Sequence, residues 1–463
     1  MSLMTTDYDT IAAISTPPGV GGIAIVRVSG STAIALVEKV FSGPDLTKVA
    51  THTINYGHLI DAGAHRETVD EVMVTVMRAP QTYTKEDIVE INCHGGIEVT
   101  NQVLQLVLRQ GARLAEPGEF TKRAFLNGRI DLSQSEAVMD LIDAKTATAQ
   151  KAALNQLDGS LSRVVKRLRQ ELVDLLANVE VNIDYPEYDG AETVTTKLMQ
   201  TKTNKIMQEL DELLQTEQQG KILRDGLETA IVGRPNVGKS SLLNCLLHEN
   251  KAIVTDVPGT TRDVLDEYVN VRGVPLHLID TAGIRKTDNQ VEKIGVDRSK
   301  AALKKADLVL LVLNASEKLT AGDRELLAAT QDSKRIILLN KTDLPELIEL
   351  DQLDVPKATL IKTSAVAENG TRALEAALAK LFFEEGVTST QLDVMVTNAR
   401  QASLLEQARS ALQTVLEGLK QGLPVDIVQI DLQRAWEFLG EITGDNYDDE
   451  LMDQLFKKFC IGK

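Results

Sequence analysis

Short apolar runs alternate with Gly and Pro turns in the first part of the chain. Two of these runs, 23–26 and 72–77, have the composition of strands, while 99–109 has the spacing of an amphipathic helix. The segment from Asp9 to about Phe125 therefore predicts an α+β domain.

The spacing becomes helical after Leu132. Apolar residues recur every three or four positions over 161–179, with basic residues between them, and again over 198–214. The same spacing returns at 404–419, before a segment that holds the only tryptophan, Trp436. Each amphipathic face needs a partner, so we expect the two helical stretches to pack together. Two separate helical units are the alternative.

Strand-like runs alternate with helical ones between these two stretches. The strand-like runs are 230–232, 276–279, 308–313, 336–339 and 359–361. Such alternation predicts a doubly wound, mostly parallel α/β sheet. We therefore predict a multidomain α+β protein in which an α/β domain is inserted into an all-α helical domain. The predicted boundaries are 1–126 for the first domain, 127–225 and 386–463 for the two helical halves, and 226–385 for the insertion.

The charge balance is acidic. The 463 residues include 50 Lys and Arg against 67 Asp and Glu, a net charge of −17, which disfavours sequence-independent binding of phosphate backbones. We therefore expect no DNA binding, and any contact with another nucleic acid should be local or shared with a partner. No apolar run approaches the ~18 residues of a membrane span, and Asp7 and Asp9 stand where a secretory leader carries basic residues. The cysteines lack disulfide or metal spacing, so His94 beside Cys93 has a structural interpretation. We expect a cytoplasmic protein with no membrane contact.

Gly233–Ser240 has the pattern G-x-x-x-x-G-K-S and lies between a predicted strand and a predicted helix. In that context the glycines let the backbone wrap around phosphates. The helix N-terminus and Lys239 supply positive potential, and the Ser240 hydroxyl can bind Mg²⁺. A chance glycine-rich turn is the alternative.

Two further motifs, in the proper order, argue against chance: Asp280 to Gly283 and Asn340 to Asp343 each follow a predicted strand. Asp280 should hold Mg²⁺ through water, and the Gly283 amide can reach the γ-phosphate. Asn340 and Asp343 choose the base, because a carboxylate accepts two hydrogen bonds from the guanine N1–H and 2-amino group, which adenine lacks. The sequence therefore predicts GTP. The GTP-binding residues of these motifs are Asn236, Val237, Gly238, Lys239, Ser240, Ser241, Asp280, Thr281, Ala282, Gly283, Asn340, Lys341 and Asp343, with Ser364 and Ala365 near the guanine oxygen.

Segments spread over the chain are typical of one family. They are Gly259-Thr260-Thr261-Arg262-Asp263, Asn236 in the P-loop, the closing Phe459-Cys460-Ile461-Gly462-Lys463, and the stretches 16–22 and 117–128. With them the chain resembles, over its whole length, the tRNA-modification GTPase family MnmE, also called TrmE. The resemblance implies a homodimer whose N-terminal domain dimerises and binds 5-formyl-tetrahydrofolate or a related tetrahydrofolate.

The resemblance also implies a reaction. With a flavoprotein partner, MnmG, the family adds an aminomethyl or carboxymethylaminomethyl group to C5 of the wobble uridine of certain tRNAs. The family uses a tetrahydrofolate-derived one-carbon unit, and its GTP hydrolysis depends on potassium and on pairing of G domains.

The same resemblance assigns catalytic groups. Ile284 stands where Ras-like GTPases carry the glutamine that orients water, and the family gives that role to Glu292. Without the family, Glu292 would be a solvated carboxylate at a helix start. Lys239 and Thr261 are the other two catalytic residues, and Thr261 binds Mg²⁺ together with Ser240. The implied K⁺ ligands are Asn236, Thr255, Val257 and Thr260, and Thr255, Thr260 and Thr261 also join the GTP-binding residues. A fixed cation there does what an arginine finger does.

The implied folate residues are Arg27, Glu90 and Arg129, with Lys463 at the end of the chain. A Glu90 carboxylate can accept the paired N–H groups of a pterin ring, and the arginines could bind a glutamate tail or a formyl oxygen. Without the family, each would be an ordinary surface charge. Cys460 has two interpretations, a reactive thiol or a spacer that docks Lys463.

Two other functions are compatible with a GTP site. Ribosome-assembly GTPases share a similar G domain but carry an RNA-binding module or a second G domain, and this chain has one P-loop. A regulatory switch would hydrolyse GTP slowly without an activator, whereas a built-in cation predicts fast turnover. The segment 387–463 has seven Lys and Arg against twelve Asp and Glu, so we expect MnmG to supply much of the basic surface that holds tRNA.

Overall fold

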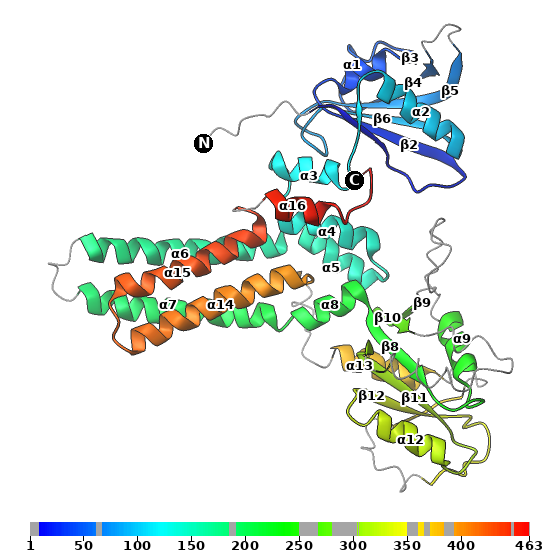
Figure 1. Cartoon of the computed structure of the whole chain (residues 1–463), viewed down its shortest axis with the longest axis vertical. Helices are drawn as coiled ribbons and strands as arrows, with labels where there is room; N and C mark the ends of the chain where they lie inside the picture. The colour runs from blue at the N-terminus through cyan, green and yellow to red at the C-terminus, as the bar shows by residue number, and fades with distance from the viewer. Residues whose placement is uncertain are drawn as a thin grey trace. The chain divides into compact units, whose positions relative to one another are not determined.

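A computed structural model describes most of the chain (Figure 1). The described residues are 9–61, 67–184, 191–249, 267–279, 303, 305–349, 360–364, 371–383, 393–445 and 449–462. They form two compact units, Met1–Met139 together with Gly440–Lys463, and Asp140–Leu439. No described helix has both the length and the apolar composition that crossing a membrane requires.

The first unit contains a seven-stranded sheet in the order β3-β4-β5-β6-β2-β1-β7. Its strands are β1 Ile11–Ile14, β2 Gly21–Ser29, β3 Phe41–Ser42, β4 Thr53–Ile60, β5 Thr68–Met77, β6 Ile88–Gly95 and β7 Arg113–Leu114. All neighbours are antiparallel except β1 and β7. The predicted α+β character of this segment is therefore confirmed.

Helices α1 (Ala33–Glu38) and α2 (Ile97–Arg109) cover one face of this sheet. Alternation along the strands decides which side chains meet them, because successive residues point to opposite faces. In β5, Val72, Val74 and Val76 are buried in the core, whereas Met73 on the other face is 44% exposed. The face away from α1 and α2 therefore keeps apolar side chains in contact with solvent.

The end of the chain packs against the middle of the first unit. Helices α3 (Glu119–Leu126), α4 (Leu132–Asp143) and α16 (Asp449–Phe456) share a small core that includes Phe125 and Phe456. Residues that lie more than 300 positions apart in the sequence are thus neighbours. This core holds the C-terminal tail on the N-terminal part of the chain.

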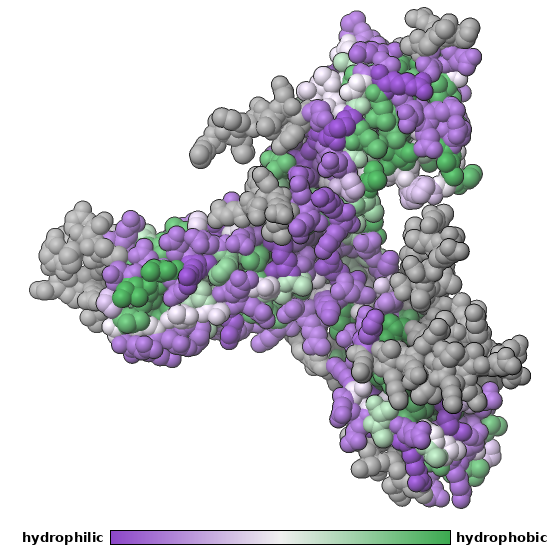
Figure 2. All heavy atoms as spheres, viewed as in Figure 1, coloured by the Kyte–Doolittle hydropathy of each residue, from purple (hydrophilic) through white to green (hydrophobic). Residues whose placement is uncertain are grey.

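The second unit is built on long helices. These are α5 Ala147–Leu157, α6 Ser160–Asp184, α7 Ala191–Leu214, α8 Glu217–Asp225, α14 Ala399–Lys420 and α15 Val425–Thr443. Helix α7 packs against both α6 and α14 although the whole α/β sheet separates α7 from α14 in the sequence. The start of α15 presents an apolar patch that includes Ile427 and Ile430 (Figure 2).

A six-stranded sheet lies between α8 and α14 in the sequence. Its elements are β8 Leu227–Val232, α9 Lys239–Glu249, β9 Glu267–Val271, β10 Val274–Ile279, β11 Leu308–Asn314, α12 Ala321–Ala329, β12 Arg335–Asn340, β13 Leu360–Lys362 and α13 Arg372–Phe383. The order is β13-β12-β11-β8-β10-β9, and only β9 is antiparallel. Helices α9 and α13 pack on one face and α12 on the other, as a doubly wound sheet requires. The predicted fold class is confirmed.

Candidate functional site

The P-loop joins β8 to α9 at the carboxyl edge of the parallel sheet, where ligands of such sheets bind. Two of its residues have left-handed backbones, Asn236 with φ 63° and Gly238 with φ 98°. A Cβ on Gly238 would lie 2.2 Å from Nδ2 of Asn340, so only glycine fits. The N-terminus of α9 follows at once, which brings the positive end of the helix dipole to this edge.

Lys239 is oriented by the loop itself. Its Nζ donates hydrogen bonds of 2.7 Å each to the carbonyl oxygens of Gly233 and Arg234. Burial lowers the pKa of the ammonium group. The side chain therefore folds back over the loop, and its charge is held where phosphates would lie.

Asn340 connects the guanine motif to the P-loop. Its Nδ2 donates to the carbonyl oxygen of Val237 at 2.9 Å, and the residue is 1% exposed. Because Asn340 ends β12 and Val237 lies beyond β8, this bond spans the sheet with β11 between them. The motif predicts a role in choosing the base, and the structure adds a role in holding the loop.

Asp343 lies in the turn that follows β12, and its carboxylate is exposed to solvent. Ser364 Oγ donates a hydrogen bond of 2.6 Å to Asp343 Oδ1, and this bond is the main reason that the pKa of Asp343 is lowered. The carboxylate is thus ionised and oriented, which suits an acceptor of two guanine N–H groups. Sequence reasoning gave Ser364 a role near the guanine oxygen and missed this contact.

Several predicted site residues lie outside the described part of the chain. They are Thr255, Val257, Thr260, Thr261, Asp280, Thr281, Ala282, Gly283, Glu292, Ala365 and Lys463. Their roles stay predictions.

A second cluster gathers three of the four predicted folate residues, Arg27, Glu90 and Arg129. Arg27 on β2 and Glu90 on β6 are paired across the strands, and Nε and Nη2 of Arg27 each lie 2.8 Å from Glu90 Oε1. The Tyr83 ring lies 5.7 Å from the Arg27 guanidinium and 4.8 Å from that of Arg129. Tyr83 is a single aromatic residue in a loop, and no sequence signal marks it.

The C-terminal tail reaches this cluster. The carbonyl oxygen of Gly462 accepts hydrogen bonds from Ser15 Oγ at 3.0 Å and from Arg27 Nη1 at 3.4 Å. Two residues earlier in the tail, the carbonyl oxygen of Cys460 accepts a hydrogen bond from the Gly118 amide at 3.2 Å. The Cys460 side chain is exposed, which is compatible with both of its interpretations.

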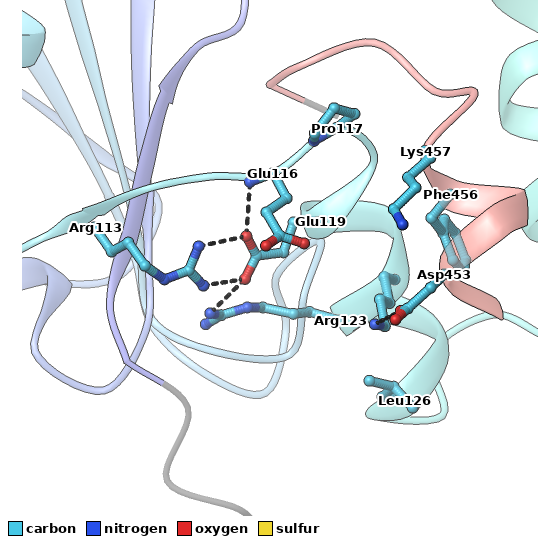
Figure 3. A pocket seen from close by; sticks show the side chains of 10 residues that line it. Arg113, Glu116, Pro117, Glu119, Arg123, Leu126, Asp453, Phe456 and Lys457 are labelled. Atoms are coloured by element: carbon cyan, nitrogen blue, oxygen red, sulfur yellow. Dashed lines mark hydrogen bonds and ion pairs between the residues drawn. The ribbon is translucent and has the colours of Figure 1, made fainter. Parts of the chain in front are cut away.

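A pocket of about 130 Å³ lies between α3 and α16 (Figure 3). Five of its charged side chains are paired with one another: Glu119 accepts from Arg113 at 2.6 Å and from Arg123 at 2.9 Å, while Lys122 pairs with Asp453. Burial alone would raise the pKa of Glu119, but the arginines and the Glu116 amide outweigh it and hold that pKa below its usual value. We interpret the pocket as the junction that fastens the tail. Arg123, which is 2% exposed, has no sequence signal.

His94 is paired with a carboxylate that sequence reasoning did not identify. Its Nδ1 lies 2.7 Å from Asp70 Oδ1, and this hydrogen bond raises the pKa of His94. The neighbouring Gly95 lies close to the backbone of β2, because a Cβ there would lie 2.5 Å from the Gly21 carbonyl oxygen. Among the residues that the structure describes, no cluster with metal-ligand composition includes His94.

A P-loop at the carboxyl edge of a doubly wound sheet, bonded to an N-K-x-D motif, defines the class: this is a P-loop GTPase. Two family models identify the family within this class: "MnmE helical domain" matches residues 132–460, and "GTP-binding protein TrmE N-terminus" matches residues 10–129. Two relatives carry the name tRNA modification GTPase MnmE. The one from Lactiplantibacillus plantarum is 64% identical over 99% of each chain, and the one from Levilactobacillus brevis is 63% identical over 100% of each.

A solved structure, the G domain of the T. maritima FeoB iron transporter, is 26% identical and covers 33% of this chain and 96% of its own, with a TM-score of 0.24. The sequence relatives decide the family. The chain belongs to the MnmE family of tRNA modification GTPases, and it is a GTP hydrolase.

Proposed function

We propose that this GTPase acts with the flavoprotein MnmG to add an aminomethyl or carboxymethylaminomethyl group to C5 of the wobble uridine of certain tRNAs. The one-carbon unit comes from a tetrahydrofolate, and hydrolysis is coupled to pairing of G domains in a cytoplasmic homodimer. The proposal rests on membership of the MnmE family, and the structural observation that supports its GTPase part is the Asn340–Val237 bond, which joins the guanine motif to the phosphate loop. In this proposal, 226–385 hydrolyses GTP, 1–126 binds folate and dimerises, and 127–225 with 386–463 forms the helical domain.

In this proposal, the cations are bound by oxygen-rich residues. Ser240 and Thr261 bind Mg²⁺, and Asp280 acts through water. K⁺ is bound by the Asn236 side chain with Thr255, Val257 and Thr260, and it supplies a fixed positive charge beside the phosphates when bound. Oxygen donors are the ligands that such hard cations prefer, and Asn236 stands in the P-loop with a left-handed backbone. Lys239 holds the phosphates, Glu292 orients the attacking water, and Asp343 selects guanine.

The potassium role has a direct test in the rate of GTP hydrolysis in KCl and in NaCl. Asn236→Ala should remove most of the potassium stimulation, because the substitution deletes a side-chain ligand. Arg272→Ala is the matched control, since Arg272 precedes β10 at the opposite edge of the sheet from the P-loop. An unchanged ratio of the two rates in Asn236→Ala would refute the role.

The folate role is supported by chemistry that converges at one place. A carboxylate, two guanidinium groups and an aromatic ring meet at Glu90, Arg27, Arg129 and Tyr83, and a pterin with an anionic tail needs those groups. Calorimetry with 5-formyl-tetrahydrofolate tests it. Arg27→Ala and Glu90→Gln should each weaken binding by about tenfold or more, as removal of a charge-assisted hydrogen bond does.

The control for the folate test is Arg109→Ala. Arg109 also forms an ion pair, with Asp61 at 3.0 Å, but α2 carries it on the covered face of the sheet. Equal losses in Arg27→Ala and Arg109→Ala would reject the site.

Homodimerisation is supported by the open face of the seven-stranded sheet. Ile54 is 67% exposed there and Tyr56 60%, and Met73 pairs with Tyr56 across β4 and β5. An uncovered apolar sheet face needs a partner surface, and a second copy of the chain supplies the same apolar face. Tyr56→Lys should convert the dimer into a monomer in sedimentation experiments, and a persistent dimer would contradict this surface.

The experiment that tests the whole proposal is nucleoside mass spectrometry of bulk tRNA from cells that lack the gene. Loss of the aminomethyl-type wobble uridines, restored by the wild-type gene but not by Asp280→Ala, is the expected result. An unchanged nucleoside profile would overturn the proposed reaction and leave a GTPase with another target.

A further inference from the structure

Arg234, the second residue of the P-loop, is held by two carboxylates that belong to no nucleotide motif. Its Nε donates to Asp323 Oδ1 at 2.8 Å and its Nη2 donates to Glu317 Oε2 at 2.8 Å. The Arg234 side chain is 24% exposed and that of Asp323 is 4% exposed. A forked guanidinium that binds two carboxylates has little freedom left, because each bond fixes a different nitrogen.

Both carboxylates are themselves anchored. Asp323 forms a capping box at the start of α12, where it accepts from the Thr320 amide at 3.0 Å and from Thr320 Oγ1 at 2.7 Å. Burial alone would raise the pKa of Asp323, but the bonds from Arg234 and Thr320 outweigh it and keep that pKa below its usual value. Glu317 accepts from Nδ2 of Asn314, the last residue of β11, at 2.6 Å. Arg234 is therefore tied to the end of one strand and the start of one helix.

The backbone of Arg234 faces Lys239. The carbonyl oxygens of Gly233 and Arg234 are the two acceptors that orient the Lys239 ammonium group. A rotation of the 233–234 backbone would move both acceptors together. Holding the Arg234 side chain is thus a way of aiming the Lys239 side chain.

We infer that Arg234 is a positioning residue of the GTP site: Asp323 and Glu317 hold it, and its backbone in turn aims Lys239 at the β- and γ-phosphates. The inference rests on the proposed nucleotide site, in which Lys239 contacts phosphate. It adds Asp323 and Glu317, which lie outside every nucleotide motif, to the groups on which GTP binding depends.

The test measures the affinity of the full-length protein for a fluorescent GDP analogue. Arg234→Ala should weaken binding by about tenfold or more, as the loss of an outer-shell partner does at a metal or active site. Arg234→Lys, which can reach one carboxylate but not form the fork, should recover part of the loss. Arg272→Ala breaks an Arg–Glu pair of the same domain, with Glu375 at 3.5 Å, and should leave the affinity within about twofold.

Repeating the Arg234→Ala substitution in a Lys239→Ala background distinguishes a positioning role that acts through Lys239 from a merely structural role of Arg234. If Arg234 acts through Lys239, Arg234→Ala should cost less than about twofold there, because contacting residues couple in a double-mutant cycle. A second measurement uses GMP as a competitor. GMP lacks the β-phosphate, so Arg234→Ala should weaken GDP binding and leave GMP binding unchanged.

The outcomes are distinct. Equal losses in the two backgrounds, or for GDP and GMP, would overturn the inference and leave the nucleotide site standing. A wild-type protein that fails to bind GDP would overturn the proposed site, and the inference with it.

Discussion

Replacing Gly118 by alanine should release the C-terminal tail. Gly118 is the N-cap of α3 and has a left-handed backbone, with φ 69°. A Cβ at this position would lie 2.7 Å from the Phe456 carbonyl oxygen and 2.8 Å from Phe459 Cβ. Real Cβ atoms do not approach backbone so closely, so the end of α16 and the tail must move.

Gly128 offers a matched control at the other end of α3. Its φ is 65°, and a Cβ there would meet only the Lys85 ammonium nitrogen, at 3.9 Å. Alanine in the left-handed region costs about 1–2 kcal/mol at either position. Overpacking against the tail adds about 2 kcal/mol at Gly118 alone. The difference between the two variants therefore isolates the tail contact.

The assay is limited cleavage by chymotrypsin, followed by intact-mass measurement. Phe456 is 2% exposed and Phe459 8% exposed, so cleavage after either requires the tail to open. When opening is rapid, the cleavage rate follows the population of the open form, and 2 kcal/mol corresponds to about 30-fold. Gly118→Ala should be cut about 30-fold faster than Gly128→Ala. Equal rates would refute the claim that Gly118 is where the tail docks.

Three further outcomes follow from single contacts. Asp343→Asn replaces a carboxylate that only accepts hydrogen bonds by an amide that both donates and accepts. GTP hydrolysis should therefore fall about a hundredfold or more, and xanthosine triphosphate should become the better substrate. A variant that still prefers GTP in a competition assay would exclude Asp343 from the base site. NMR should give His94 a pKa above its usual value of about 6.5, and Asp70→Asn should return the pKa to that value. The pair stabilises the fold fully below about pH 6.5, and this stabilisation is lost as pH rises through the raised pKa. A His94 pKa that Asp70→Asn leaves unchanged would disprove the pairing. Gly220→Ala should lower the melting midpoint although alanine favours helices, because its Cβ would lie 2.1 Å from the Val396 carbonyl oxygen. A higher midpoint would show that the backbone at Val396 moves aside at no cost.

The regular elements of the α/β insertion were predictable because their signals are local. Buried parallel strands are continuous apolar runs, and β11 and β12 match the predicted 308–313 and 336–339 within one or two residues. The long helices were found from their spacing, although α6 and α7 start earlier or end later than the periodic residues do. The two-residue strands β3 and β7 were missed, because two residues carry no period.

The site was predictable only where its chemistry lies within a few consecutive residues. The P-loop and the guanine motif are contiguous, and each carries its own mechanism. The bond between Asn340 and Val237, the Arg234–Asp323 pair and the placement of Tyr83 beside Arg27 join residues far apart in sequence. No spacing rule connects such residues, since strand order and loop paths bring them together.

The sequence by itself determined the class of ligand, because the groups that bind phosphate and choose guanine are set by residues next to one another on the chain. Tertiary structure decided what supports them. The register of β2 against β6 places Arg27 opposite Glu90, and the packing of Phe456 and Phe459 brings Gly462 to the same arginine. Burial and pairing are properties of the packed chain, since a charge such as Arg123 is an ordinary surface residue until the fold encloses it and supplies its carboxylates.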